Sequence, residues 1–195
     1  MLRKAIVWKS QRRFHPNSKL KTPNSKLKNG AGSAPLREMG IYMGNPMSRI
    51  ENVELTVLCL IEDGDKILLQ NRVKKDWQGY ALPGGHVESG ESFVDAVIRE
   101  MKEETGLTII NPRLVGVKQF PIEEGRYIVL LFKATQWSGE LVSSEEGQME
   151  WLKYSDLPAV KTVDDFDDLL RVMNTPELTE FQYLVSGDEW TVAIK

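Results

Sequence analysis

The feature that most constrains the fold of this 195-residue sequence is a single helix-forming segment, which lies between pairs of strand-like runs. The segment spans residues 92–105, where Ser92 and Asp95 have a capping-box spacing and Gly106 supplies a typical stop. The side chains expected to form its buried stripe are Val94, Val97, Ile98 and Met101. Strands and helices do not alternate strictly along the chain, which disfavours a doubly wound dinucleotide fold.

The strand-like runs predict three hairpins, of which two flank the helix and one ends the chain. Their strands are expected at 54–61 with 66–73, at 114–122 with 126–135, and at 181–185 with 190–194. Shorter strands are expected at 80–82 and 149–152, with a tight loop at Pro83-Gly84-Gly85 between the first of these and the helix. A second helix is expected at 163–174, capped by Thr162 with Asp165.

Charge divides the chain near Met47. Residues 1–46 carry ten Lys or Arg and one acid, whereas residues 47–195 carry 15 basic and 27 acidic residues. The first part repeats Pro-Asn-Ser-Lys-Leu-Lys and has few apolar residues, so we interpret it as a disordered basic leader ahead of one domain at 47–195. It fits a basic arm, a transit peptide or, the interpretation we favour, an artefact preceding a natural start at Met47.

Composition excludes several classes of protein. The single cysteine, Cys59, rules out an intramolecular disulfide framework and disfavours a cysteine-based zinc site. Cys59 is expected to be an inert core thiol. No apolar run approaches the roughly 18 residues of a membrane span, and no secretory segment is recognisable. We therefore expect a cytoplasmic protein without a membrane partner. The acidic body repels nucleic acid, so only residues 1–46 are candidates for binding it.

Three acids stand where a helix disfavours them. Glu100, Glu103 and Glu104 share one face of the last turns of the helix, where the dipole favours cations. Ion pairing with the neighbouring Arg99 relieves only part of this charge. An exposed, solvated charge run is the competing interpretation, but a divalent ion explains the position of the acids better. Carboxylates without histidine or cysteine indicate a hard ion, Mg²⁺ or Mn²⁺. The glycines before the helix allow backbone to approach this face closely.

These residues resemble a known family motif. Gly85, five residues, Glu91, seven residues and then the run from Arg99 to Leu107 look like the Nudix box without deviation. The body also resembles a MutT-type Nudix hydrolase in element order, most nearly the bacterial 8-oxo-dGTP diphosphatases. The resemblance implies an α/β/α sandwich with a mixed β-sheet, and it is compatible with a homodimer.

The resemblance also implies roles for individual residues. The metal ligands would be Glu100, Glu103 and Glu104, together with the carbonyl group of Gly84. Arg99 would position the acids, and Glu91 would assist the metal or orient the site. A later acid, Glu145 or Glu146, competes with Glu100 for the role of general base. The implied reaction is Mg²⁺-dependent cleavage of a nucleoside diphosphate linked to a group X.

Other residues have two interpretations each. Arg72, Gly84, Gly85 and His86 are candidates to contact the substrate, although Arg72 and His86 equally suit exposed positions. Lys74 and Lys75 are similar to Arg72 in this respect. The side chains of Trp77, Tyr80 and Phe120 are candidates to stack on a base, but packing within the protein is the interpretation we prefer for them.

The leading hypothesis is a nucleotide-pool sanitising enzyme that releases a nucleoside monophosphate from 8-oxo-dGTP. Within enzymes, the alternatives are hydrolysis of ADP-ribose, a nucleotide sugar or capped RNA. The alternative outside enzymes is a non-catalytic Nudix module that senses a ligand. The presence of every acid of the Nudix box argues against it.

Overall fold

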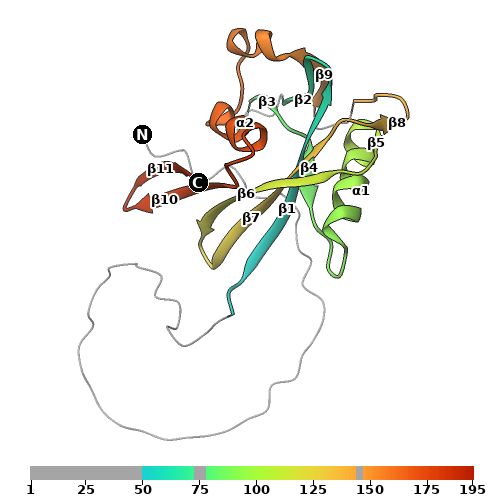
Figure 1. Ribbon diagram of the computed structural model, residues 1–195. Helices are drawn as coiled ribbons and strands as arrows, with labels where there is room; N and C mark the ends of the chain where they lie inside the picture. The colour runs from blue at the N-terminus through green and yellow to red at the C-terminus, as the bar shows by residue number, and fades with distance from the viewer. Residues whose placement is uncertain (1–49, 73–77, 144–146) are drawn as a thin grey trace, which may run out of the picture. The chain divides into compact units, whose positions relative to one another are not determined.

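The computed structural model describes residues 50–72, 78–143 and 147–195 (Figure 1). The expected leader at 1–46 lies outside the described residues, and so do Glu145 and Glu146. The same holds for Lys74, Lys75 and Trp77. The expectations placed on all these residues therefore stay predictions.

A mixed, curled sheet forms the centre of the described fold. Its main path runs β11-β10-β6-β7-β1-β2-β3, with β4 paired to β1 and β9 paired to β2. Two pairings are parallel, β1 with β7 and β6 with β10, and the others are antiparallel. The strands are β1 (Val53–Asp63), β2 (Lys66–Arg72), β3 (Gly79–Ala81), β4 (Gly84–His86), β6 (Arg113–Ile122), β7 (Gly125–Ala134), β9 (Gly147–Lys153), β10 (Glu180–Ser186) and β11 (Glu189–Ile194). A separate small sheet joins β5 (Thr108–Ile109) to β8 (Trp137–Ser138).

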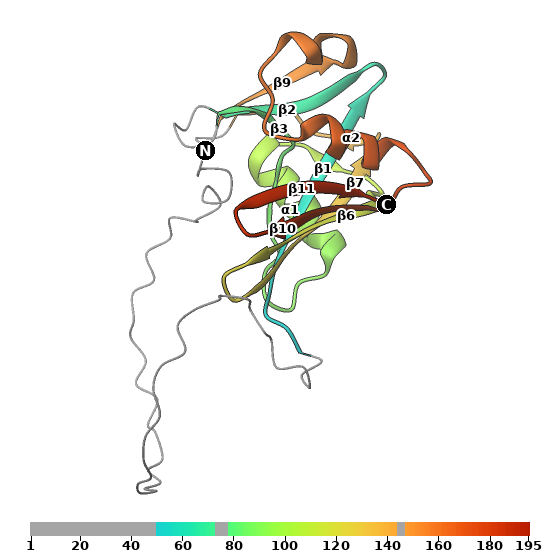
Figure 2. The same ribbon diagram turned by 90° about the vertical axis from the view of Figure 1, so that its left-hand side faces the viewer.

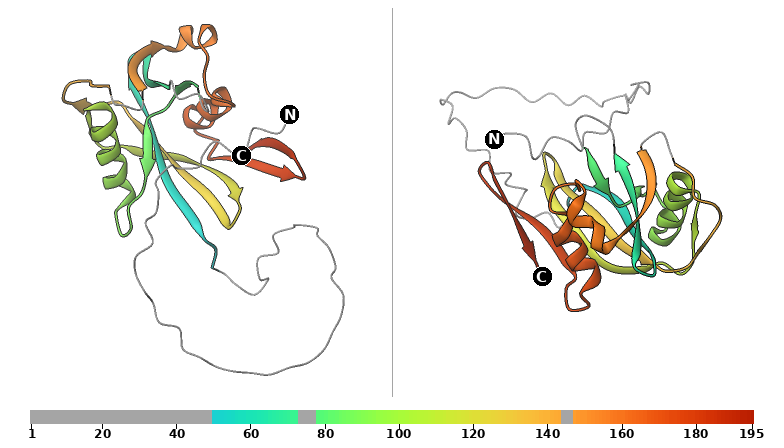
Figure 3. Two further views of the ribbon diagram at one scale, coloured as in Figure 1. Left: turned by 180° about the vertical axis from the view of Figure 1, so that it is seen from behind. Right: turned by 90° about the horizontal axis from the view of Figure 1, so that it is seen from above.

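The two helices cover opposite faces of the sheet, as Figure 3 shows. Helix α1 (Phe93–Thr105) buries Val97 and Met101 against side chains such as Cys59. Helix α2 (Phe166–Asn174) packs on the other face, in a core that includes Leu60. The result is the expected α/β/α arrangement. Burial raises the pKa of the Cys59 thiol well above its usual range, which is consistent with an inert core cysteine.

All three expected hairpins are present, and α1 has the expected ends. The amide of Asp95 donates a hydrogen bond to Ser92 Oγ, at 3.3 Å, and Gly106 ends the helix with a φ of 75°. The prediction that Val94 belongs to the buried stripe is wrong. Its side chain is 45% exposed, and Ala96, two residues later, is buried instead. The described residues contain no helix that is long and apolar enough to cross a membrane.

Three local expectations are corrected by the structure. Gly84 and Gly85 are not a loop but belong to β4, which pairs with β1. Helix α2 begins at Phe166, three residues later than expected, because Asp165 takes a left-handed conformation with a φ of 57°. Thr162 is therefore not its cap, and Asp165 makes no side-chain capping bond. A 3-10 helix at Tyr154–Ala159 had no sequence prediction.

Candidate active site

The charged face of α1 is turned away from the core by the packing of its apolar face. Ala96, Val97 and Met101 are completely buried, whereas the side chain of Glu103 is 59% exposed. Lys102 does not neutralise the acids, since its ammonium group donates to the carbonyl oxygen of Gly106 at 2.8 Å. The acids therefore depend on another cation for compensation.

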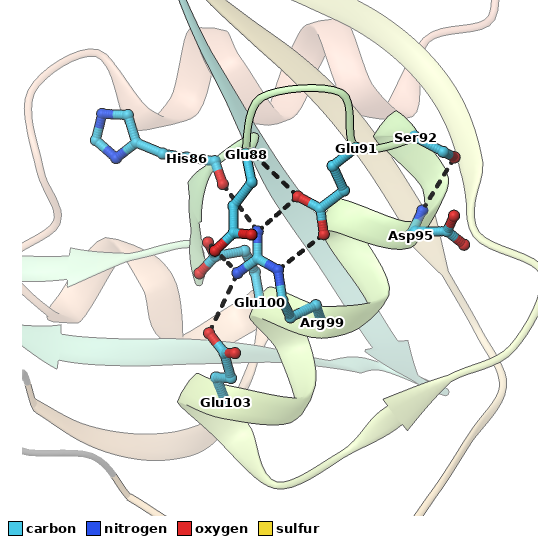
Figure 4. Close-up of polar contacts among 8 residues, drawn as sticks. All are labelled: His86, Glu88, Glu91, Ser92, Asp95, Arg99, Glu100 and Glu103. Carbon is cyan, nitrogen blue, oxygen red and sulfur yellow. Dashed lines mark hydrogen bonds and ion pairs between the residues drawn. The ribbon is translucent and has the colours of Figure 1, made fainter.

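Arg99 supplies part of this compensation, and its guanidinium group lies at the centre of the site (Figure 4). Nε and Nη2 each donate to Glu91 at 2.8 Å, which makes a bidentate pair. Nη1 donates to Glu100 at 2.8 Å and to Glu103 at 3.2 Å. Nη2 also donates to the carbonyl oxygen of His86 at 3.0 Å. One side chain thus joins the loop before the helix to two acids on it.

The pKa values of Glu91 and Glu100, the two acids that lie 2.8 Å from Arg99, are shifted in opposite directions. Hydrogen bonds from Arg99 and from the backbone amide of Glu88 lower the pKa of Glu91 to about 2. Burial raises the pKa of Glu100 above its usual range, although the neighbouring Arg99 opposes this shift. Glu91 is therefore held as a carboxylate, while Glu100 has the greater tendency to take up a proton.

The paired glycines of β4 give the carboxylates close access to backbone. A Cβ atom added to Gly85 would lie 2.3 Å from Oε2 of Glu100, so this acid packs directly on the glycine. The amide of Gly84 donates to Glu104 Oε2 at 2.9 Å. These contacts bring together five predicted site residues: Gly84, Gly85, Glu100, Glu104 and, through Arg99, Glu103.

Two other predicted residues have side-chain hydrogen bonds to partners outside this cluster. His86 Nε2 pairs with Glu54 Oε1 at 2.8 Å, on the face of the sheet opposite α1, although its carbonyl group contacts Arg99. Arg72 ends β2, and its Nη1 donates to the buried Gln70 at 2.9 Å. Sequence reasoning missed both Glu54 and Gln70. The contact of Glu54 with His86 depends on the pairing of β1 with β4, which no local pattern encodes, whereas Gln70 lies two residues from Arg72 on the same strand.

The donor set of this face fits a hard divalent cation. Glu100, Glu103 and Glu104 supply oxygen atoms only, the chemistry that Mg²⁺ and Mn²⁺ prefer. Among the described residues, no three histidine, cysteine, aspartate or glutamate side chains already converge as a metal site. Arg99 instead lies between acids, and Nη1 contacts both Glu100 and Glu103. A bound ion would therefore need the exposed Glu103 carboxylate to turn from Arg99.

These features define the class of protein, and the chain belongs to the NUDIX domain family, whose model matches residues 53–171. It is 44% identical over 105 residues to the Bacillus subtilis protein described as an uncharacterized Nudix hydrolase, YvcI, covering 51% of this chain and 65% of that protein. It is 39% identical over 103 residues to the ADP-ribose pyrophosphatase of Methanocaldococcus jannaschii, covering 51% and 61%. The chain thus spans less than two thirds of both relatives.

Solved structures show the same fold. The MutT protein from Bacillus halodurans superposes with a TM-score of 0.62 and 29% sequence identity, over 72% of this chain and 97% of that one. This agreement confirms the family and the mixed, helix-covered sheet that the sequence predicted.

Proposed function

We propose that this chain is an Mg²⁺-dependent Nudix hydrolase, for which Mn²⁺ can substitute, that cleaves the pyrophosphate bond of a nucleoside diphosphate linked to a group X. The observation that carries the proposal is the set of acids organised by Arg99 on α1 beside the glycines of β4. A module that only binds its ligand does not require all of Glu91, Glu100, Glu103 and Glu104.

Each residue of the cluster has a distinct part in the proposed reaction. Glu100, Glu103 and Glu104 would hold the ion, which neutralises phosphate charge and makes water more acidic. Arg99 orients Glu100 and Glu103, while Glu91 holds Arg99 by two parallel hydrogen bonds. The Glu100 carboxylate is our candidate to accept a proton from the attacking water, since burial raises its pKa. Glu145 and Glu146 stay alternatives for that step.

For the substrate, we propose an oxidised purine triphosphate such as 8-oxo-dGTP, hydrolysed to the nucleoside monophosphate. A second candidate is ADP-ribose, which is favoured by the similarity to the archaeal ADP-ribose pyrophosphatase. The test is kcat/KM with Mg²⁺ for 8-oxo-dGTP, dGTP, ADP-ribose, NADH and nucleotide sugars. We expect 8-oxo-dGTP to give the highest value. A higher value for ADP-ribose would overturn the substrate assignment but not the reaction class, whereas no turnover of any compound would overturn both.

The organising role of Arg99 gives a separate prediction. Arg99→Lys is expected to lower kcat/KM about tenfold or more, because lysine keeps the charge but loses the planar guanidinium group that binds Glu91, Glu100 and Glu103 at once. Arg126→Lys is the matched control, since Arg126 makes a similar two-nitrogen pair with Glu51 at 3.1 and 3.0 Å on an exposed surface. Equal kinetic effects of the two substitutions would contradict a specific role for Arg99.

A further inference from the structure

Gln70 on β2 is a completely buried polar side chain that contacts another side chain. It follows the apolar run Ile67-Leu68-Leu69 on the same strand. In the part of the chain that the structure describes, the other buried polar side chains are those of Thr56 and Thr105, and each donates to a backbone carbonyl group. Gln70 instead accepts a hydrogen bond from the guanidinium group of Arg72, at 2.9 Å. Its burial therefore serves a contact with a charged residue.

The chemistry of Arg72 fixes the orientation of the Gln70 amide group. A guanidinium group can only donate hydrogen bonds, so the amide oxygen of Gln70 must face it. The Nε2 atom then points elsewhere, and among the residues that the structure describes no acceptor reaches it. A buried donor without an acceptor lowers the stability of a fold. Stability alone thus does not explain an amide at this position, whereas a function of its oxygen atom does.

The contact of Arg72 with Gln70 differs from the contacts that hold Arg99. Arg99 donates to three carboxylates, whose negative charge compensates its own. The amide of Gln70 is neutral, so the bond to Gln70 orients a guanidinium group without placing a negative charge beside it. A planar guanidinium group with a fixed orientation is suited to bind two oxygen atoms of a phosphate group at once.

Glycines flank Arg72 on both neighbouring strands. Figure 2 shows β2 running between β9 and β3. The residues paired with Arg72 are Gly79 on β3 and Gly147 on β9, so neither has a side chain to cover it. A Cβ atom added to Gly147 would also lie 3.0 Å from Cγ of Gln70, so this glycine gives the stem of Gln70 its place. The register therefore leaves space beside the half-buried Arg72 and holds its partner.

The side chains of Gln70 and Arg72 lie on the side of the sheet that α1 covers. Side chains two residues apart on a strand share a face, and Leu68, two residues before Gln70, packs in the same core as Met101 of α1. Met149, which pairs with Gln70 on β9, belongs to that core as well. Arg72 is therefore on the same side of the sheet as the acids of the candidate active site.

We propose that Gln70 is a positioning residue, which orients the guanidinium group of Arg72 towards a phosphate group of the substrate. This inference rests on the proposed function and adds how the anionic part of the substrate is held. Gln70 acts through Arg72 and needs no contact with the substrate. Its neutral oxygen gives Arg72 an orientation and leaves the positive charge to attract the phosphate, whereas a carboxylate at this position would oppose that attraction.

The test is equilibrium binding of methylenediphosphonate with Mg²⁺, measured by calorimetry, because the carbon bridge of this diphosphate analogue resists hydrolysis. Gln70→Met keeps the length of the side chain but removes the acceptor, and it should weaken binding about tenfold. Arg72→Met should weaken binding at least as much. The double variant should bind no more than about twofold more weakly than Arg72→Met, because Gln70 acts only through Arg72.

Two further variants separate positioning from a structural role. Gln70→Glu fits the same space and bonds more strongly to Arg72, so a merely structural role predicts wild-type affinity, whereas we expect weaker binding because the added negative charge opposes the anion. Gln119→Met is the matched control, since the amide of this strand glutamine donates to Glu180 at 2.8 Å. It should leave the affinity unchanged. Thermal melts of Gln70→Met should stay close to those of the wild type, since the change removes an unpaired buried donor.

The inference and the proposed function can fail separately. Unchanged affinity in Gln70→Met, wild-type affinity in Gln70→Glu, or independent, multiplying losses in the double variant would each overturn the inference. The same holds if the wild-type protein does not bind methylenediphosphonate. If the expected pattern is found but the protein hydrolyses no nucleotide with Mg²⁺, the positioning role stands and the proposed function fails.

Discussion

Glu103→Gln is expected to lower kcat by at least about 100-fold while leaving the melting temperature nearly unchanged. The substitution keeps the size of the side chain but removes the negative charge that a hard cation requires. The fold depends little on this residue, since the side chain is 59% exposed and its polar contact is a 3.2 Å bond from Arg99. Turnover of the best substrate, measured over a range of Mg²⁺ concentrations, gives the comparison.

The control for this prediction is an exposed acid on the other helix. Asp167→Asn removes an exposed carboxylate from the first turn of α2 and should leave kcat unchanged. Wild-type turnover of Glu103→Gln at saturating Mg²⁺ would rule out Glu103 as a metal ligand. A rise in the Mg²⁺ concentration needed for half-maximal activity, together with the fall in kcat, is the pattern that a ligand role predicts.

Local sequence signals were sufficient for much of the fold. Gly64, with a φ of 60° and open space around it, lies in the turn of the first hairpin, between the strands that the sequence predicted at 54–61 and 66–73. The ends of α1 follow from Ser92 and Gly106, which act on residues a few positions away. The start of α2 did not follow, because Asp165 bonds to Tyr183 rather than capping its helix. That partner is 18 residues away, so no local capping rule includes it.

The site was predictable to the extent that one helix carries it. The spacing of Glu100, Glu103 and Glu104 places them together on any helix, and the dipole argument identified them as unusual. The contribution of β4 was not predictable in the same way. Strand pairing with β1 places Gly85 under Glu100, and it also brings Glu54 to His86. These contacts join residues separated by up to 32 positions, which a local pattern does not encode.

Gly85→Ala is expected to reduce kcat about 100-fold with only a small loss of stability, because it displaces a single carboxylate. The added Cβ atom would lie 2.3 to 2.6 Å from the three carboxylate atoms of Glu100, far below normal contact. The end of a flexible side chain can move away, so the backbone need not shift. Glu100 would then leave the position in which Nη1 of Arg99 holds it, and a displacement of about 1 Å costs on the order of 100-fold in rate.

Two matched glycines separate this effect from general damage. Gly84→Ala would place a Cβ atom 2.1 Å from the carbonyl oxygen of Val57, which is backbone, so this variant should lose stability strongly. Gly187→Ala meets nothing within 4 Å but has a φ of 60°, so it should cost about 1 kcal/mol and leave kcat intact. Thermal melts and kcat are measured on all three. A Gly85→Ala protein with wild-type turnover would show that Glu100 functions without its close contact with Gly85 on β4.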